Sequence, residues 1–236
     1  MSDPLVVIPG FMADVRSFLP QIMYFGRTRP VILFLPTQSI SVKQMALAAE
    51  TVLPKSFALL GHGLGGQVAI EILRRLPKAV SRISLLATDP LPEPPHTAAA
   101  REARMVAAKS GKLAEAISHE LPAAAFAEGP RKEEVLELLR KMGADLGADV
   151  FKRQSRALQR RPDQQKVLAK LKVPALILAG ASDTIVPTRR QEFLAGLMPF
   201  GRAIVIPDAG HMPQLEQPEA VTGALAEFLA GPLLLR

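Results

Sequence analysis

Apolar runs recur along the first third of the chain and again near its end, and segments with helical spacing separate them. The runs lie at residues 5–8, 31–35, 57–60, 81–86, 173–179 and 202–206. Mostly continuous apolar runs of this length are typical of strands buried on both faces of a parallel sheet. The intervening segments, such as 64–76, repeat their apolar residues at helical spacing. The alternation predicts an α/β protein with a mostly parallel sheet of about six strands, flanked by helices.

The pattern changes after residue 90. Prolines at 90, 92, 94 and 95 mark a stiff exit from the predicted sheet. From 97 to 159 the chain is rich in Ala, Glu, Lys and Arg, and glycine and proline positions divide it into about four helices. These helices have apolar faces of their own, so they pack as a unit. We expect a first part of the core at 1–90, a helical cap at 91–164 and a second part of the core at 165–236.

A glycine-rich turn joins the third apolar run to the helix that follows it. Residues 59–70 read Leu-Leu-Gly-His-Gly-Leu-Gly-Gly-Gln-Val-Ala-Ile. A strand, a tight turn and a helix in this order form a nucleophile elbow, normally written Gly-x-Ser-x-Gly, with the serine on the strained turn. Glycines allow the turn to form and the helix to approach the sheet. Gly63 stands where the serine hydroxyl is expected.

An aspartate and a histidine follow the last two predicted strands. Asp183 ends the sequence Gly-Ala-Ser-Asp at 180–183, and His211 ends Asp-Ala-Gly-His at 208–211. Functional groups of open parallel sheets gather at the carboxyl ends of the strands. Asp183 could instead cap the helix near residue 188, and a lone histidine is often structural. Their positions favour a catalytic pair.

The order of elbow, acid and histidine is that of the α/β-hydrolase triad. With the turn at 8–11 and the Glu-x-Pro sequence at 216–218, the chain resembles α/β-hydrolase-fold proteins of the small esterase and lactonase type over nearly its whole length. By this resemblance, the first two antiparallel strands of that fold are reduced or missing here. The resemblance implies that His211 acts as general base and acid, that Asp183 orients it, and that Gly63 marks the nucleophile position.

The resemblance also implies an oxyanion hole and a pocket under the cap. Its donors would be the backbone N–H groups of Phe11 and Leu64, although Pro9 replaces the histidine usual before this turn. Asp89 is expected at the pocket rim or as a loop cap, and Ser17, a possible surrogate hydroxyl, as the cap of the first helix. The candidate pocket residues are Met12, His62, Asp89, Met105 and Met212. Leu113 and Ile117 are further candidates for the acyl side.

Gly63 has three interpretations. It is an engineered replacement of the serine of an ordinary hydrolase, or it is native and His211 with Asp183 activates a water molecule, or it is native in a protein that binds a ligand without turnover. Loss of a triad nucleophile costs on the order of 10⁶ in turnover. The complete acid–histidine pair favours chemistry, so we predict hydrolysis of a carboxylic ester or lactone. A catalytically silent binding protein and a cofactor-free lyase-type reaction with His211 as base are the alternatives.

Composition narrows the environment and partners that we expect. The 236 residues include no cysteine, which excludes disulfides and thiol chemistry. No apolar run reaches the length of a membrane span, and the beginning of the chain lacks a signal-peptide pattern. We therefore expect a cytoplasmic protein that does not enter a membrane. Because no cluster of metal ligands or nucleotide motif is present, we expect no metal and no cofactor.

The positive charge of the chain does not point to nucleic acid. Net charge is +7, but residues 91–164 hold 13 Lys and Arg against 11 Asp and Glu, and the remainder holds 16 against 11. The basic doublets 160–161 and 189–190 have no interleaved aromatic residues that could stack on bases. The expected partner is a small-molecule ester or lactone, and the expected assembly is a monomer or homodimer.

Overall fold

The computed structural model describes residues 3–232, and a six-stranded sheet forms its centre. The strands are β1 (Leu5–Ile8), β2 (Val31–Leu33), β3 (Phe57–His62), β4 (Val80–Leu86), β5 (Ala175–Gly180) and β6 (Gly201–Ile206). Their order is β2-β1-β3-β4-β5-β6, and every neighbouring pair is parallel. The predicted fold class is confirmed. Within the described residues the sheet has no antiparallel strand.

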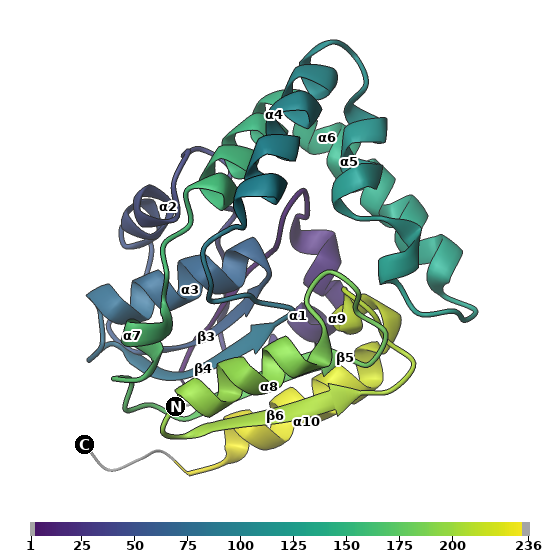
Figure 1. Cartoon of the computed structure of the whole chain (residues 1–236). Coiled ribbons are helices and arrows are strands. Elements are labelled where there is room, and N and C mark those ends of the chain that lie inside the picture. Colours follow the sequence, from purple (N-terminus) through teal and green to yellow (C-terminus); the bar gives the residue numbers. More distant parts are fainter. Residues whose placement is uncertain (1–2, 233–236) are drawn as a thin grey trace.

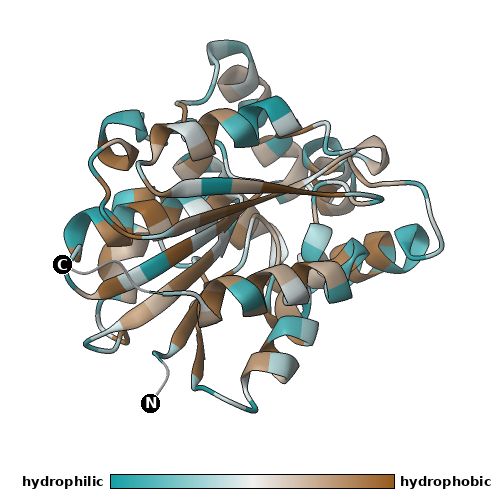
Figure 2. Ribbon diagram, turned by 90° about the horizontal axis from the view of Figure 1, so that it is seen from below, coloured by the Kyte–Doolittle hydropathy of each residue, from teal (hydrophilic) through white to brown (hydrophobic). Residues whose placement is uncertain are grey.

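Helices cover both faces of the sheet, which explains why its strands are mostly apolar. Val6 and Leu59 pack on one face with apolar residues of α2 (Val42–Ala49), α3 (Leu64–Arg75) and α8 (Thr188–Leu197). Val7 and Leu60 point to the opposite face and pack with α1 (Leu19–Phe25) and α10 (Pro218–Ala230). Successive strand residues thus serve two cores. In Figure 2 the strands are accordingly mostly brown, the colour of hydrophobic residues.

The chain between β4 and β5 forms helices only. They are α4 (Pro95–Lys109), α5 (Leu113–Glu120), the short 3₁₀ turn η2 (Ala123–Ala125), α6 (Lys132–Gln159) and α7 (Gln165–Leu168). Helices α4, α5 and α6 contact one another and lie together beyond one end of the sheet (Figure 1). Gly147, at φ 79° and ψ 172°, interrupts α6 with a kink. The segment therefore contains the helical breaks that its glycines predict, near 111 and 147.

The start of the first helix differs from the prediction. A 3₁₀ turn, η1 (Val15–Phe18), precedes α1, and the Asp14 carboxylate caps it by accepting a hydrogen bond from the N–H of Arg16 at 2.9 Å. The hydroxyl of Ser17 donates to the carbonyl oxygen of Asp14 at 2.7 Å. The expectation that Ser17 caps the helix was wrong, because the aspartate three residues earlier already satisfies the turn. Among residues 3–232, no helix has both the length and the apolarity to cross a membrane.

Candidate active site

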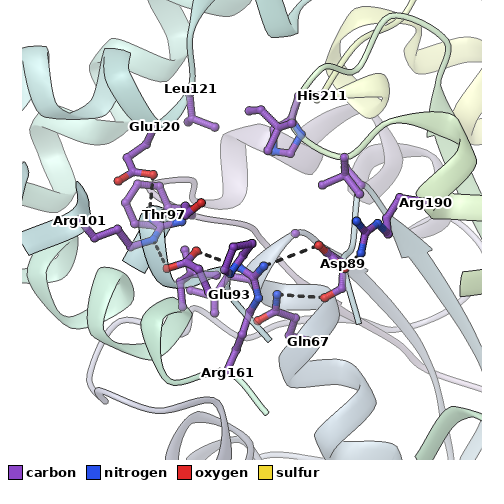
Figure 3. Close-up of a pocket in the computed structure, with 18 residues that line it drawn as sticks. Gln67, Asp89, Glu93, Thr97, Arg101, Glu120, Leu121, Arg161, Arg190 and His211 are labelled. Carbon is purple, nitrogen blue, oxygen red and sulfur yellow. Dashed lines mark hydrogen bonds and ion pairs between the residues drawn. The ribbon is translucent and has the colours of Figure 1, made fainter. Parts of the chain in front are cut away.

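A cavity of about 280 Å³ lies between the carboxyl ends of the strands and the cap helices (Figure 3). The loops that follow β1, β3, β4, β5 and β6 contribute Phe11, Gly63, Asp89, Ile185 and His211 to its wall. Parallel strands end at one edge of a sheet, and that edge is where ligands bind in open α/β folds. The cap contributes the opposite wall, from α4, α5 and α6.

His211 and Asp183 form a buried pair beside this cavity. Nδ1 of His211 lies 3.0 Å from Oδ2 of Asp183. The other carboxylate oxygen of Asp183 accepts hydrogen bonds from the N–H groups of Ile185 and Val186, at 2.8 and 3.0 Å. These two bonds fix the carboxylate, so Oδ2 is held toward the imidazole. With Nδ1–H donated to the carboxylate, Nε2 of His211 is left as an unprotonated base.

Glu216 holds the loop that carries His211. Its carboxylate, on the short helix α9 (Pro213–Glu216), accepts hydrogen bonds from the N–H groups of Gly210, Met212 and Ala127, at 2.8 to 2.9 Å. Burial raises the pKa of Glu216 above its ordinary value, against the opposite effect of these donors. Because Ala127 belongs to the cap segment, one carboxylate joins the histidine loop to the cap.

His62 packs directly against His211. The two rings meet edge to face with centroids 5.0 Å apart, and Nε2 of His62 lies 2.8 Å from the carbonyl oxygen of His211. A carbonyl only accepts, so Nε2 carries the proton in this contact. Burial, with a smaller contribution from His211, lowers the pKa of His62 to about 3. His62 is therefore a neutral ring that supports the loop of His211.

Gly63 has the backbone of a strained elbow. Its φ is 51° and its ψ is −116°, a conformation that disfavours L-residues with a side chain. A Cβ built there would meet only the carbonyl oxygen of Ala87, at 3.9 Å. The elbow therefore has room for a side chain, and without one this space adjoins the cavity that Gly63 lines.

The N–H groups of Phe11 and Leu64 are both available at the cavity. Both residues line it, and within the described chain neither N–H donates a hydrogen bond to a protein acceptor. Gly65 brings the two turns together, since a Cβ at this position would collide with the carbonyl oxygens of Ile8 and Pro9. Leu64 also begins α3, where helix N–H groups lack internal acceptors and carry partial positive charge.

The cap wall of the cavity is strongly charged. Arg101 of α4 donates to Glu93 at 2.8 Å and to Glu120 at 2.7 Å, and Arg161 donates to Glu93 at 3.0 Å. The Glu93 and Glu120 side chains are 1% and 6% exposed. Buried carboxylates require such partners because desolvation of an unpaired charge is costly. Glu93 and Glu120 are thus fully paired within an ionic network, part of which the dashed lines of Figure 3 trace.

Four of the predicted pocket residues lie elsewhere. Met12, His62, Met105 and Met212 are buried and do not line the cavity. Met12 and Met105 pack in the main apolar core, as does Met212, so the pocket prediction for these residues was wrong. Leu113 and Ile117 also pack against or within that core instead of the cavity wall. Asp89 does line the cavity, and it also caps its loop by accepting from Leu91 N–H at 3.0 Å.

Sequence reasoning missed the charged wall and the residues that hold the loops. In the sequence, the doublets at 160–161 and 189–190 were weighed only as possible nucleic-acid contacts, whereas Arg161 and Arg190 line the cavity. Gln154 of α6, fully buried, accepts from Met12 N–H at 2.8 Å and donates to the carbonyl oxygen of Pro36 at 3.1 Å. In the part of the chain described, no three His, Asp or Glu side chains are grouped to hold a metal ion.

Comparisons with known proteins agree with this architecture. The model of the alpha/beta hydrolase family matches residues 5–224. A pimeloyl-[acyl-carrier protein] methyl ester esterase from Edwardsiella ictaluri is 28% identical over 247 residues, covering 95% of this chain and 87% of that protein. A dihydrolipoyllysine-residue acetyltransferase component of an acetoin cleaving system, from Pseudomonas putida, is 28% identical over 96% of this chain, which spans 63% of that longer protein.

Two solved structures have the same fold. An esterase from Thermogutta terrifontis superimposes with a TM-score of 0.86 at 24% identity, over 97% of this chain and 90% of that one. An enol-lactonase from Burkholderia xenovorans superimposes with a TM-score of 0.87 at 18% identity, over 98% and 92%. Together with the match over residues 5–224, these findings show that the chain belongs to the alpha/beta hydrolase family.

Proposed function

We propose that this protein hydrolyses a small carboxylic ester or lactone, with His211 as the base that activates water. The observation that carries the proposal is the 3.0 Å contact between His211 Nδ1 and Asp183, beside a cavity that His211 shares with Gly63. A binding protein has no evident need for an imidazole held by a buried, doubly anchored carboxylate. The esterase and lactonase relatives support the choice of substrate class.

The site provides each group that ester hydrolysis requires. Nε2 of His211 takes a proton from a water molecule in the open space over Gly63, and the resulting hydroxide adds to the carbonyl carbon. Negative charge develops on the carbonyl oxygen, where the N–H groups of Phe11 and Leu64 stabilise it. When the C–O bond to the leaving alkoxide breaks, protonated His211 returns the proton to that oxygen. The products are a carboxylic acid and an alcohol, or a hydroxy acid from a lactone.

Asp183 stabilises the imidazolium that forms between these steps. The carboxylate is 1% exposed, so its charge acts on His211 with little screening by water. Asp183 also keeps the imidazole in the tautomer with Nε2 free, without accepting the proton itself. The same geometry would serve a serine at position 63, for which the elbow has space.

A second candidate is a cofactor-free elimination in which His211 removes a proton from the substrate itself. The missing hydroxyl at Gly63 favours it, because such a reaction needs a base and an oxyanion site but no nucleophile. A silent ligand-binding protein is the third candidate. Product analysis separates elimination from hydrolysis, and substitution of His211 separates both from binding alone.

The test compares four proteins on an activated short-chain ester and a panel of lactones: the chain as it stands, His211→Ala, Gly63→Ser, and the double variant. Gly63→Ser should gain about 10²-fold or more, and His211→Ala should abolish that gain. His119→Ala is the matched control, since His119 is an exposed histidine of the cap. If the chain as it stands is inactive, or if His211→Ala changes nothing, the proposal of water activation by His211 fails, and activity of Gly63→Ser alone would show a triad that lacks only its nucleophile.

A further inference from the structure

The ionic network of the cavity wall pairs three arginines with three carboxylates. Arg101, Arg161 and Arg190 line the cavity together with Asp89, Glu93 and Glu120. Arg104 also pairs with Glu120 but does not line the cavity. Within this balanced wall, a guanidinium with free donors attracts an anionic ligand more strongly than it would in open water.

The inner part of the network, around Glu93 and Glu120, is fully paired and cannot bind a ligand. Both oxygens of Glu93 accept from arginines at 2.8 and 3.0 Å, and both oxygens of Glu120 do so at 2.7 and 3.0 Å. The side chain of Arg101 between them is 8% exposed. These contacts are short and buried, so a ligand could replace them only by breaking charge-assisted hydrogen bonds.

The outer part of the network is open. Arg161 and Arg190 approach Asp89 from two sides, and each guanidinium lies 3.6 Å from the nearer carboxylate oxygen (Figure 3). That distance exceeds a hydrogen bond, so neither ion pair is a direct donation. Among the described residues, the contact with Asp89 is the only ion pair of Arg190, whose side chain is 38% exposed. Arg190 thus keeps its guanidinium donors free on the cavity wall.

We propose that Arg190, backed by Arg161, binds a carboxylate of the substrate, so that the substrate is a small ester or lactone with a second, free carboxylate. This inference rests on the proposed function for the ester or lactone part. A carboxylate fits better than a phosphate, because one guanidinium with free donors matches one negative charge, whereas a phosphate ester carries about −1.5 to −2. A planar guanidinium also pairs with a carboxylate through two parallel hydrogen bonds.

Carboxylate recognition also suits the shape of the cavity. At about 280 Å³ it lies near the lower end of ligand pockets, which range over roughly 300–1,000 Å³. Leu64, Leu121 and Val186 line it together with the charged groups, so an apolar spacer can lie between the reacting carbonyl and the anion. The expected ligand is therefore short, with both of its functional ends held within one cavity.

The experiment measures binding with a ligand that cannot be hydrolysed. The ketone 5-oxohexanoate imitates an ester and carries a carboxylate, and 5-oxohexanamide is its neutral counterpart of the same shape. Calorimetry at low ionic strength should give a Kd about tenfold lower for the carboxylate than for the amide in the chain as it stands. Arg190→Gln should reduce that preference to less than about twofold, whereas Arg190→Lys should retain part of it.

Arg189→Gln is the matched control, because Arg189 is the exposed neighbour on α8 and does not line the cavity. It should preserve the preference for the carboxylate. The proposal is overturned if both ligands bind equally, if neither binds, if Arg189→Gln acts like Arg190→Gln, or if 4-oxopentylphosphonate binds more tightly than the carboxylate. Since no turnover is involved, the carboxylate can bind even where ester hydrolysis fails, and the two proposals fail separately.

Discussion

Nε2 of His62 donates to the carbonyl oxygen of His211 at 2.8 Å while its ring packs edge to face on the imidazole of His211. Two histidines in contact cannot both be protonated at low cost, and burial decides which one stays neutral. His62 is 1% exposed and His211 lines the cavity. The elbow residue thus supports the candidate base without competing for its proton.

The pKa of His62 gives a prediction for stability in acid. Burial lowers this pKa from 6.5 in the unfolded chain to about 3, so the unfolded state binds more protons in between. The free energy of unfolding should therefore fall as pH falls from about 6.5 toward 3, with a contribution from His62 of roughly 1 kcal/mol per pH unit. Urea unfolding at several pH values measures the slope.

His62→Gln removes this titration, so the variant should show a shallower slope than the unmodified chain. His119→Ala, at an exposed histidine, should keep the full slope. The pKa of Glu216 is raised, so Glu216 makes the free energy of unfolding rise as pH falls. This contribution is the same in each of these proteins and cancels when their slopes are subtracted. Equal slopes for His62→Gln and the unmodified chain would contradict the buried, neutral state of His62.

Glu216→Gln should destabilise the protein and weaken the site. Three N–H groups point at the Glu216 carboxylate, and an amide would turn its own N–H₂ toward at least one of them. We expect a loss of about 1–3 kcal/mol in the free energy of unfolding. In the Gly63→Ser background, kcat should fall with little change in KM, since the loop of His211 is displaced. Glu219→Gln, at a side chain 80% exposed, should change neither quantity.

Gln154→Ala should lower activity from a distance. The Gln154 amide satisfies the N–H of Met12 and the carbonyl oxygen of Pro36, both in buried surroundings. Met12 has φ 50° and directly follows Phe11, so the bond from its N–H to Gln154 holds the turn that also carries the Phe11 N–H. We expect about 1–3 kcal/mol of lost stability and a lower kcat in the Gly63→Ser background. Lys152→Ala, an exposed change on the same helix, should leave kcat unaltered.

Gly63→Ala and Gly63→Ser should cost similar stability and differ in activity. Both place a side chain at φ 51° and ψ −116°, which strains the backbone by about 1–3 kcal/mol. Neither meets a steric obstacle, because the nearest atom to the new Cβ is 3.9 Å away. Thermal unfolding should give matching losses, and only the serine variant should gain esterase activity. An alanine variant that gained as much would show that position 63 does not carry the nucleophile.

Local signals explain why much of the fold could be predicted. Mostly continuous apolar runs identified each strand, because a strand covered on both faces has few polar residues. Gly111 and Gly147, both at positive φ, end or kink helices close to where the glycines predicted breaks. The helix α9 was missed, since its four residues are too few to show a helical period.

The site could be predicted only where a motif and a strand end coincide. Phe11, Gly63 and His211 meet at one cavity because parallel strands deliver their following loops to one edge. Met12 and Met105 were misplaced, since an apolar side chain in a sequence suits a core as well as a pocket. The direction in which each of these side chains points depends on how α6 and α4 pack in the folded protein.

The sequence by itself determined the α/β class, the parallel sheet, the elbow with glycine at its centre, and the order of acid and histidine, because these follow from patterns within short segments. Only the tertiary structure decided the wall of the cavity. Arg101, Glu120 and Arg161 are ordinary charged positions of surface-like helices in the sequence, and they become a buried ionic network when the cap folds over the sheet. Packing between distant segments, which leaves no local pattern, determines which face of a helix meets solvent and which meets the cavity.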